Sequence, residues 1–305
     1  MVLNMIELTV GAMLRMSTPL LLAALGGMFA SRSGIMALGL EGMILSGAFF
    51  SVWGSYITNN GVLGILIGML AAVLVSLCNA WLCIKYHVNH VIAGLGINMS
   101  VTALTAILLQ MIWNTSSNSP QVASVPHITV PILSEIPGIG TLFSNQSVVT
   151  YLGILLVPIV WYVMFQSVFG MRVRVIGNNP YSASTAGVNV NRYKYAAMTI
   201  CGAFAGLAGA YLSLCQLNLF TEGMSAERGY IANVICALGA SNPFGILAAS
   251  LFFGLADAAQ IVLEEANIPS QLIRTLPYVA TLIALMVVKN SNSTAMFVGK
   301  HFDER

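Results

Sequence analysis

Residues 62–84 read VLGILIGMLAAVLVSLCNAWLCI, an apolar run without a single charged residue. A helix needs about 20 predominantly apolar residues to cross the hydrocarbon core of a bilayer, so this stretch is long enough to span a membrane alone. Residues 91–113, 148–169 and 195–217 have the same character and similar length. These four stretches predict an all-α protein whose helices cross a membrane.

The composition extends this prediction to the whole chain. Of the 305 residues, 57% are hydrophobic and only 7% are charged, and the mean hydropathy is +0.85. A soluble domain carries about 25% charged residues, which excludes a soluble fold. We therefore expect a single membrane domain over residues 1–305, a polytopic helical bundle of about nine segments, with eight to ten as the range. The remaining apolar segments cover residues 20–30, 34–57, 230–240, 243–262 and 272–288, and the one at 230–240 is short enough to predict a broken helix.

Two loops predict the orientation of the bundle. Residues 170–194 carry four basic residues and no acidic one, and such loops remain in the cytoplasm. Residues 114–147 carry no Lys or Arg and four prolines, so we expect an extracytoplasmic loop there. Basic residues from Lys289 to Arg305 place the C-terminus in the cytoplasm, and an odd number of spans then leaves the N-terminus outside.

Small residues and cysteines predict packing rather than chemistry. Gly64 and Gly68, like Gly202 and Gly206, have the small-xxx-small spacing that lets helices approach closely in lipid, and Gly209 adds another such site. The five cysteines all lie in apolar runs and lack the spacing of a disulfide or zinc framework. We expect them to be buried thiols.

Several function classes lack their signatures. A net charge of +2 is no footprint for nucleic acid. His87 and His90 are spaced H-x-x-H, but no further His or carboxylate lies nearby in the sequence to complete a metal site. The sequence contains neither a phosphate-binding loop nor a nucleophile elbow. We therefore expect no enzyme activity, no metal and no cofactor, and a pump would take its energy from a partner or an ion gradient.

Polar and ionisable residues lie within or beside the apolar segments and suggest a function in the transport of a solute. Each costs several kcal/mol in the bilayer unless it faces a cavity or a partner, so together they predict a water-accessible path for a hydrophilic solute. Taken alone, each also has a structural explanation: Glu41, between glycines, could cap a helix break, and Asp257 could hold neighbouring helices together. The residues concerned are Glu41, Asn98, Glu222, Glu227, Arg228 and Asp257.

The most informative pattern is GMRVRVIGNNPYSASTAGVNV at residues 170–190. We expect Asn179 to cap a short helix whose first residue is Pro180, since the missing N–H of proline costs nothing there. Gly187 fits the left-handed residue that ends such a helix. A short helix with small side chains beside basic residues suits insertion into a cleft on another protein, although an ordinary basic loop has similar features.

This region closely resembles the coupling region of permease subunits of bacterial ABC importers, in the binding-protein-dependent family that includes the ribose, branched-chain amino acid and nucleoside permeases. The shared pattern over residues 172–194 is a basic pair, an aliphatic-Gly-x-Asn stretch, small residues, Ala-Gly-x-Asn-Val and a basic start to the next helix. Residues 32–43 (RSGIMALGLEGM), 89–98 (NHVIAGLGIN), 229–232 and 268–272 are similar to the nucleoside-type permeases.

The resemblance implies an ABC importer permease fold built on inverted repeats, in the bacterial inner membrane. It implies two cytoplasmic ATP-binding subunits, a second permease subunit, alike or different, and an extracytoplasmic solute-binding protein or lipoprotein. The expected solute is a nucleoside or related purine; ribose or another simple sugar is the alternative, and an ion-coupled secondary transporter is a further one. The residues expected to dock the ATPase are Asn179, Pro180, Tyr181, Ser182, Ala183, Ser184, Ala186 and Gly187.

A path for nucleosides needs polar groups for ribose hydroxyls and base edges between apolar walls. We expect Glu41 and Asn98 to line this path, followed by Gln216 and Asn218. Closure of the ATPases would move the short helix and the spans around it, and so switch the path between outward and inward access. An ion-coupled carrier would leave the pattern at 170–194 unexplained.

Overall fold

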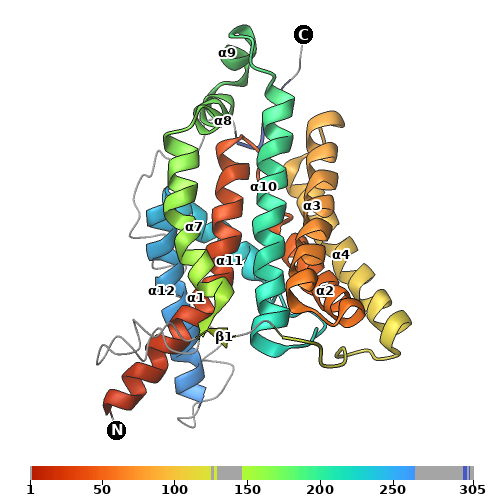
Figure 1. Ribbon diagram of the computed structural model, residues 1–305. Coiled ribbons are helices and arrows are strands. Elements are labelled where there is room, and N and C mark those ends of the chain that lie inside the picture. Colours follow the sequence, from red (N-terminus) through yellow and green to blue (C-terminus); the bar gives the residue numbers. More distant parts are fainter. Residues whose placement is uncertain (1, 125–126, 129–145, 265–297, 301, 303–305) are drawn as a thin grey trace.

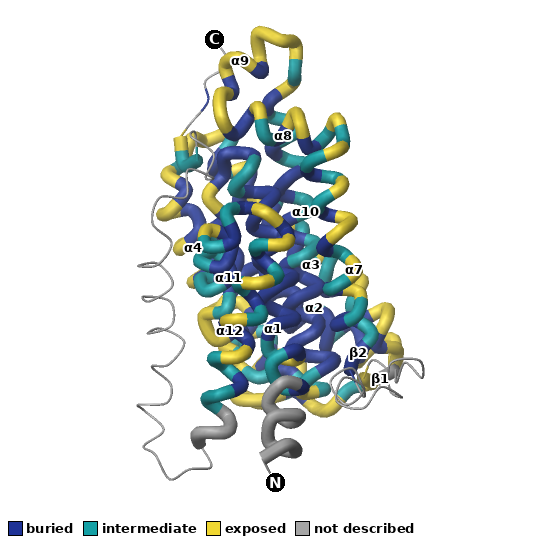
Figure 2. The backbone as a smooth tube through the Cα atoms, turned by 90° about the vertical axis from the view of Figure 1, so that its left-hand side faces the viewer, coloured by how far each residue is buried: buried dark blue, intermediate teal, exposed yellow. Residues whose placement is uncertain are grey.

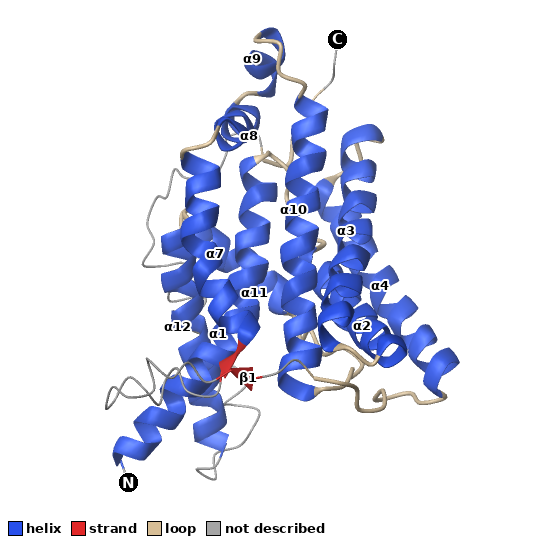
Figure 3. Ribbon diagram, viewed as in Figure 1, coloured by secondary structure: helices blue, strands red, loops and turns tan. Residues whose placement is uncertain are grey.

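The computed structural model describes residues 2–124, 127–128, 146–264, 298–300 and 302. These residues form a bundle of helices, most of them aligned along one axis (Figure 1). Almost all of the secondary structure is helical, and the exception is one short pair of strands (Figure 3). The helices are α1 (Val2–Arg32), α2 (Leu40–Thr58), α3 (Gly61–Lys85), α4 (His90–Trp113), α7 (Val148–Phe165), α8 (Val168–Asn178), α9 (Pro180–Thr185), α10 (Val190–Ala210), the π-helix η1 (Tyr211–Leu217), α11 (Arg228–Leu238) and α12 (Pro243–Glu264).

The two strands and helix α9 lie at opposite ends of the bundle. Strand β1 (His127–Ile128) pairs antiparallel with β2 (Gln146–Ser147), and this pair lies at the end where α1 begins (Figure 1). Helices α8 and α9 lie at the other end, together with the C-terminus. The two loops predicted to face opposite sides of the membrane are thus separated by the length of the bundle.

Six helical stretches in the described part of the chain are long and apolar enough to cross a membrane. The chain is therefore a multi-pass membrane protein. Two more predicted segments are present as α2, of 19 residues, which is not among these six, and as the short helix α11, of 11 residues. The ninth predicted segment, 272–288, and the motif at 268–272 lie outside the described residues. The six candidate spans are Gly11–Arg32, Gly61–Lys85, His90–Trp113, Val148–Phe165, Val190–Leu217 and Pro243–Gln260.

The stretch predicted as a loop at 170–194 is largely helical. Its first part forms α8, which Ser167 caps by accepting a hydrogen bond from Gly170 N at 3.2 Å. Its last residues belong to α10, which begins at Val190 and not at the expected residue 195. Asn189 causes the earlier start, because its side-chain oxygen accepts a hydrogen bond from Arg192 N at 3.0 Å.

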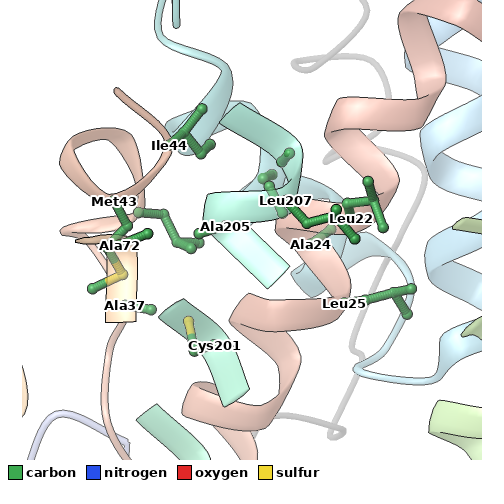
Figure 4. Packing of buried hydrophobic residues seen from close by; sticks show 14 of the residues in the cluster. Leu22, Ala24, Leu25, Ala37, Met43, Ile44, Ala72, Cys201, Ala205 and Leu207 are labelled. Atoms are coloured by element: carbon green, nitrogen blue, oxygen red, sulfur yellow. The ribbon is translucent and has the colours of Figure 1, made fainter. Parts of the chain in front are cut away.

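The core lies where α1, α2, α3 and α10 meet. The candidate spans differ in the buried share of an 18-residue apolar stretch within each of them. This share is 72% in Gly11–Arg32 of α1 and 78% in Val190–Leu217 of α10 and η1, against 28% in α3 and 33% in α4. Helices α1 and α10 therefore run through the interior, while α3 and α4 expose many large apolar side chains. Figure 4 shows core residues Leu22, Ala24 and Leu25 of α1, Met43 and Ile44 of α2, Ala72 of α3, and Cys201, Ala205 and Leu207 of α10, with Ala37 from the connection between α1 and α2.

Glycines allow α2, α3 and α10 to pack backbone against backbone. A Cβ atom at Gly209 would lie 2.1 Å from the carbonyl oxygen of Ile44, and one at Gly68 would lie 2.5 Å from that of Gly47. Lipid supplies no hydrophobic drive between helices, so such close contact is a main source of packing energy. The small-residue spacing in the sequence therefore predicted this interface correctly.

Four of the five cysteines are buried, as expected, and all five are free thiols. Cys78 differs, because it lies on the outward side of α3 and is exposed. An apolar run predicts membrane burial, but it does not tell which side of a helix faces the protein interior.

Candidate functional site

Helix α11 packs one face against α1, α2 and α12 but is too short to cross a membrane. Its 11 residues extend about 16 Å at 1.5 Å per residue, against about 30 Å for the hydrocarbon core. The first N–H groups and last C=O groups of any helix lack partners within it, and in a membrane protein other parts of the chain must satisfy them. The polar residues around α11 meet this need.

Glu41, in the first turn of α2, caps the N-terminus of α11. Its Oε1 accepts a hydrogen bond from Glu227 N at 3.0 Å, and its Oε2 accepts one from Gly229 N at 2.7 Å. A Cβ at Gly229 would lie 2.4 Å from Glu41 N, so only glycine allows this approach. A negative charge is also favourable there, because the N-terminus is the positive end of the helix dipole.

Arg32, at the end of α1, binds the other end of α11. Its Nη2 donates hydrogen bonds to the carbonyl oxygens of Ala240 at 3.1 Å and Ser241 at 2.9 Å. Both carbonyls belong to the turn after α11, where Ala240 and Ser241 have left-handed backbones with φ of 54° and 48°. A positive charge is favourable at the C-terminal end of a helix. The connection between α1 and α2 thus places opposite charges at the two ends of α11.

Asn98 of α4 joins three elements at the first turn of α11. Its Oδ1 accepts a hydrogen bond from Gly42 N, and its Nδ2 donates to Leu38 O and to the Tyr230 hydroxyl, each at 2.9 Å. Asn98 is buried, so these bonds satisfy its amide within the protein. The structure therefore brings Glu41 and Asn98, two of the four predicted path residues, to the same place.

Gln216 and Asn218 lie at the end of η1, where they contact other elements. Gln216 Nε2 donates a hydrogen bond to Arg15 O at 3.1 Å. Asn218 ends η1 in a left-handed conformation, with φ of 56°, and its backbone oxygen accepts from Val122 N at 3.0 Å. Its Oδ1 is buried and has no hydrogen-bond partner among the described residues. No hydrogen bond in the described part of the chain links this pair to Glu41 or Asn98.

The other ionisable candidates surround the start of α11. Arg228 Nη1 donates to Met224 O at 3.3 Å, and Arg228 also acts electrostatically on Asp257 of α12. The side chains of Glu222 and Glu227 are exposed. His90, from the H-x-x-H pair, has a structural contact: its Nδ1 accepts a hydrogen bond from Met36 N at 3.3 Å.

Helix α9 has the local structure that its sequence predicts. Asn179 Oδ1 accepts hydrogen bonds from Tyr181 N and Ser182 N, both at 3.2 Å, and Pro180 is the first helical residue. Gly187 follows the helix in a left-handed conformation with φ of +78°. Pro180 and Ala183 are buried, whereas Tyr181 is 48% exposed. The helix projects from its end of the bundle with most of its surface uncovered (Figure 2).

Three residues of this site were not predicted from the sequence. Arg32 and Tyr230 lie in segments 32–43 and 229–232, which resemble the nucleoside-type permeases, but neither was predicted as a site residue. The third is Asn233, whose Nδ2 donates a hydrogen bond to Ala37 O at 3.1 Å. Tyr230 and Asn233 are three residues apart on one short apolar segment, and that spacing on a helix was the available signal.

Comparison with known proteins identifies the family. Residues 9–288 match the family described as the branched-chain amino acid transport system permease component. The chain belongs to this permease family. It is therefore a membrane component of a transporter rather than an enzyme.

Three relatives align with most of this permease. The nucleoside ABC transporter permease NupC of Lactococcus lactis is 33% identical, with 98% of this chain and 95% of NupC covered. The guanosine ABC transporter permease NupQ of Bacillus subtilis is 32% identical, with 93% and 92% covered. TsgC13 of Haloferax volcanii, provisionally named a glucose ABC transporter permease, is 34% identical, with 82% and 76% covered.

Bacillus subtilis and Lactococcus lactis each have a second relative that is less similar to this chain. NupP of Bacillus subtilis, also named a guanosine ABC transporter permease, is 25% identical, and this permease covers 84% of it. NupB of Lactococcus lactis, also named a nucleoside ABC transporter permease, is 21% identical, and 79% of it is covered. Because 95% and 92% of this chain align with them, these second relatives are longer proteins than the permease described here.

Proposed function

We propose that this permease forms half of the membrane path of a nucleoside ABC importer. The observation that carries the proposal is the alignment of 98% of the chain with a nucleoside permease at 33% identity, supported by the similar match to a guanosine permease. Nucleosides or related purines are therefore the proposed solutes. A simple sugar is the second candidate, because TsgC13 matches at comparable identity.

The energy comes from two ATP-binding subunits that dock on α9. Support for this docking surface comes from the shape of the region: α9 stands at one end of the bundle, is capped at its start and stopped at its end, and exposes small polar side chains. A rigid, protruding helix of this kind transmits displacement better than a flexible loop. The proposed docking set remains residues 179–184, 186 and 187.

That end of the bundle faces the cytoplasm in this proposal. Lys85, Arg172, Arg174, Arg192 and Lys194 all lie on or beside α8, α9 and the adjoining ends of α3 and α10, as the distribution of basic residues in membrane proteins favours. The opposite end then faces outward, where a solute-binding protein or lipoprotein delivers the nucleoside. The membrane is the inner membrane of a bacterium.

The second half of the path comes from a different, longer permease. In two bacteria the relatives occur as a shorter and a longer protein with the same named solute, and this chain resembles the shorter one more. A heterodimer explains why both kinds exist together. The outward apolar faces of α3 and α4 provide surface for lipid and for this second subunit.

The solute path runs beside α11 and its partners. Glu41 and Asn98 hold the start of this half-helix, and half-helix ends inside a membrane supply polar groups to solutes in transporters. Gln216 and Asn218 belong to the outer part of the path, near the strands. In this arrangement the four residues shape the wall of the path at two levels.

Uptake measurements test the solute and the coupling together. Cells that lack the chain are complemented with the wild type, with Gly187→Val or with Gly187→Asn, and uptake of labelled guanosine and glucose is measured. The backbone of Gly187 is left-handed and a Cβ there meets no neighbour, so valine strains α9 without a clash, while asparagine tolerates this conformation. We expect guanosine uptake to require the chain, to fall with valine and to persist with asparagine.

Other results would change the proposal in defined ways. Loss of glucose uptake alone in the deletion strain would keep the ABC mechanism and replace the solute. Guanosine uptake that survives both ATP depletion and the valine variant would contradict the coupled mechanism and favour an ion-coupled carrier.

A further inference from the structure

A small apolar cluster, separate from the main core, supports α9. Its buried members are Ile176 of α8, Ala183 of α9, Val190 of α10 and Phe302 near the C-terminus. Phe302 is 7% exposed, and the centre of its ring lies 5.1 Å from that of Tyr181. The C-terminal segment thus contributes the large side chain of a cluster that otherwise joins three neighbouring helices.

The same segment also contacts the connection between α1 and α2. Gly299 N donates a hydrogen bond to Gly34 O at 3.1 Å. Gly34 belongs to the connection that runs from Arg32, the last residue of α1, to α2, whose first turn holds Glu41. Arg32 and Glu41 are the two residues whose charges hold the ends of α11. Gly299 therefore contacts the connection between α1 and α2, and Phe302 contacts α9.

Helix α9 depends on such support. It has only six residues, and a helix of that length is unstable unless tertiary contacts hold it. Of its residues, only Pro180 and Ala183 are buried. Ala183 offers a single methyl group, and Phe302 provides the only aromatic ring among the buried members of the cluster on which α9 rests in the described part of the chain.

We propose that Phe302 is a positioning residue for α9 and that Phe302 and Gly299 together transmit the displacement of α9 to the α1–α2 connection. The proposal rests on the proposed role of α9 as the ATPase-docking helix. When the ATPases move α9, the ring of Phe302 moves with it, and the hydrogen bond at Gly299 draws on the connection between Arg32 of α1 and the first turn of α2, which holds Glu41. The position of α11 beside the solute path then follows the nucleotide state of the partners.

The test compares F302A, F302L and Y86A in the complete transporter, reconstituted in liposomes with its ATPase subunits, second permease and binding protein. Tyr86 is a matched control, because its exposed ring packs on Trp81 at the end of α3, outside the cluster. Guanosine uptake and ATP hydrolysis are measured on the same liposomes, and amide hydrogen exchange is followed at residues 180–185. These readouts separate a coupling role from a contribution to stability alone.

We expect F302A to hydrolyse ATP but to transport at least roughly fivefold less guanosine per ATP, the lower end of typical coupling between sites. Exchange at 180–185 should accelerate in F302A, F302L should recover most of the loss, and Y86A should match the wild type. Loss of the ATPase subunits from F302A at normal membrane abundance would equally support positioning of α9. If F302A does not accumulate, F302V is measured in its place with the same outcomes.

A wild-type ratio of uptake to hydrolysis in F302A, with unchanged exchange at α9, would overturn the proposal and leave the proposed function standing. Failure of the proposed function looks different, because the wild-type transporter itself would then show no ATP-dependent guanosine uptake.

Discussion

Replacement of Glu41 by glutamine tests the polar clamp on α11 directly. Both oxygens of the carboxylate accept hydrogen bonds from backbone N–H groups, at 3.0 Å from Glu227 and 2.7 Å from Gly229. Glutamine has nearly the same shape but only one acceptor oxygen. Its NH2 group must then face one of the two N–H donors, and the negative charge at the N-terminus of α11 is lost.

The magnitude follows from these two losses. A hydrogen bond to a charged group contributes about 1.5–3 kcal/mol, and a favourable charge at a helix terminus adds about 0.3–1 kcal/mol. We therefore expect the free energy of unfolding to fall by about 2–4 kcal/mol. In a chain of this size that corresponds to a drop in the unfolding midpoint of roughly 4–8 °C, at about 2 °C per kcal/mol.

Thermal unfolding of the purified permease in detergent measures this drop. The matched control is Glu222→Gln, which makes the same chemical change at an exposed position in the segment before α11; surface changes of this kind stay within about 0.5 kcal/mol. Equal midpoints for the Glu41 variant and the wild type would refute the clamp. Uptake by the Glu41 variant should also fall, because α11 loses its fixed position beside the proposed path.

Three further results follow from the same geometry, each read as the midpoint of thermal unfolding. Gly209→Ala forces a methyl group against Ile44 O and should lower the free energy of unfolding by about 1–3 kcal/mol or more. At Gly96 an added methyl group meets no neighbour, so Gly96→Ala should raise it by up to about 1 kcal/mol. Equal effects of the two variants would contradict the packing. Arg32→Gln removes the charge-assisted bonds at the C-terminal end of α11 and should cost about 1.5–3 kcal/mol; an unchanged midpoint would show that water satisfies those carbonyls. Tyr230→Phe removes one hydroxyl acceptor and should cost only about 0.5–1.5 kcal/mol, so a loss as large as that of the Glu41 variant would contradict the assignment.

Most of the helices could be predicted from the sequence because membrane spans leave a strong local signal. The run at 62–84 became α3 (Gly61–Lys85), and the run at 91–113 became α4 (His90–Trp113). Length and apolarity decide these elements without reference to neighbours. The cap at Asn179 and the left-handed Gly187 were likewise predictable, because both depend on a few adjacent residues.

Helix α8 was missed because its signal differs from that of a span. It is an amphipathic surface helix with buried Val173 and Ile176 beside exposed Arg172 and half-buried Arg174. An inspection based on long apolar runs and positive charge classifies such a stretch as a loop. The π-helix η1 was missed for a related reason, since nothing in its local composition separates it from the end of α10.

The site was predictable in its residues but not in its partners. Glu41 and Asn98 are polar groups in apolar surroundings, and that contrast identified them. Their hydrogen bonds to Gly229 N and to the Tyr230 hydroxyl connect positions separated by more than 130 residues. Contacts of that kind depend on how the helices pack, and a single sequence does not contain that information.

The geometry joins the structural and functional interpretations of the half-buried charges Arg32 and Glu41. A charge inside a membrane protein is expensive, and here Arg32 and Glu41 offset that cost by satisfying the two ends of a half-helix that lipid would leave unsatisfied. A full-length span would not need them, so the charges and the short helix require each other. Arg32 ends α1, Glu41 lies in the first turn of α2, and Asn233 of α11 donates to Ala37 between them. Because α11 is held by residues on and beside this one connection, it moves when the connection moves. The arrangement that stabilises α11 therefore also makes its position adjustable, and a path that alternates between two sides of a membrane needs an element of this kind.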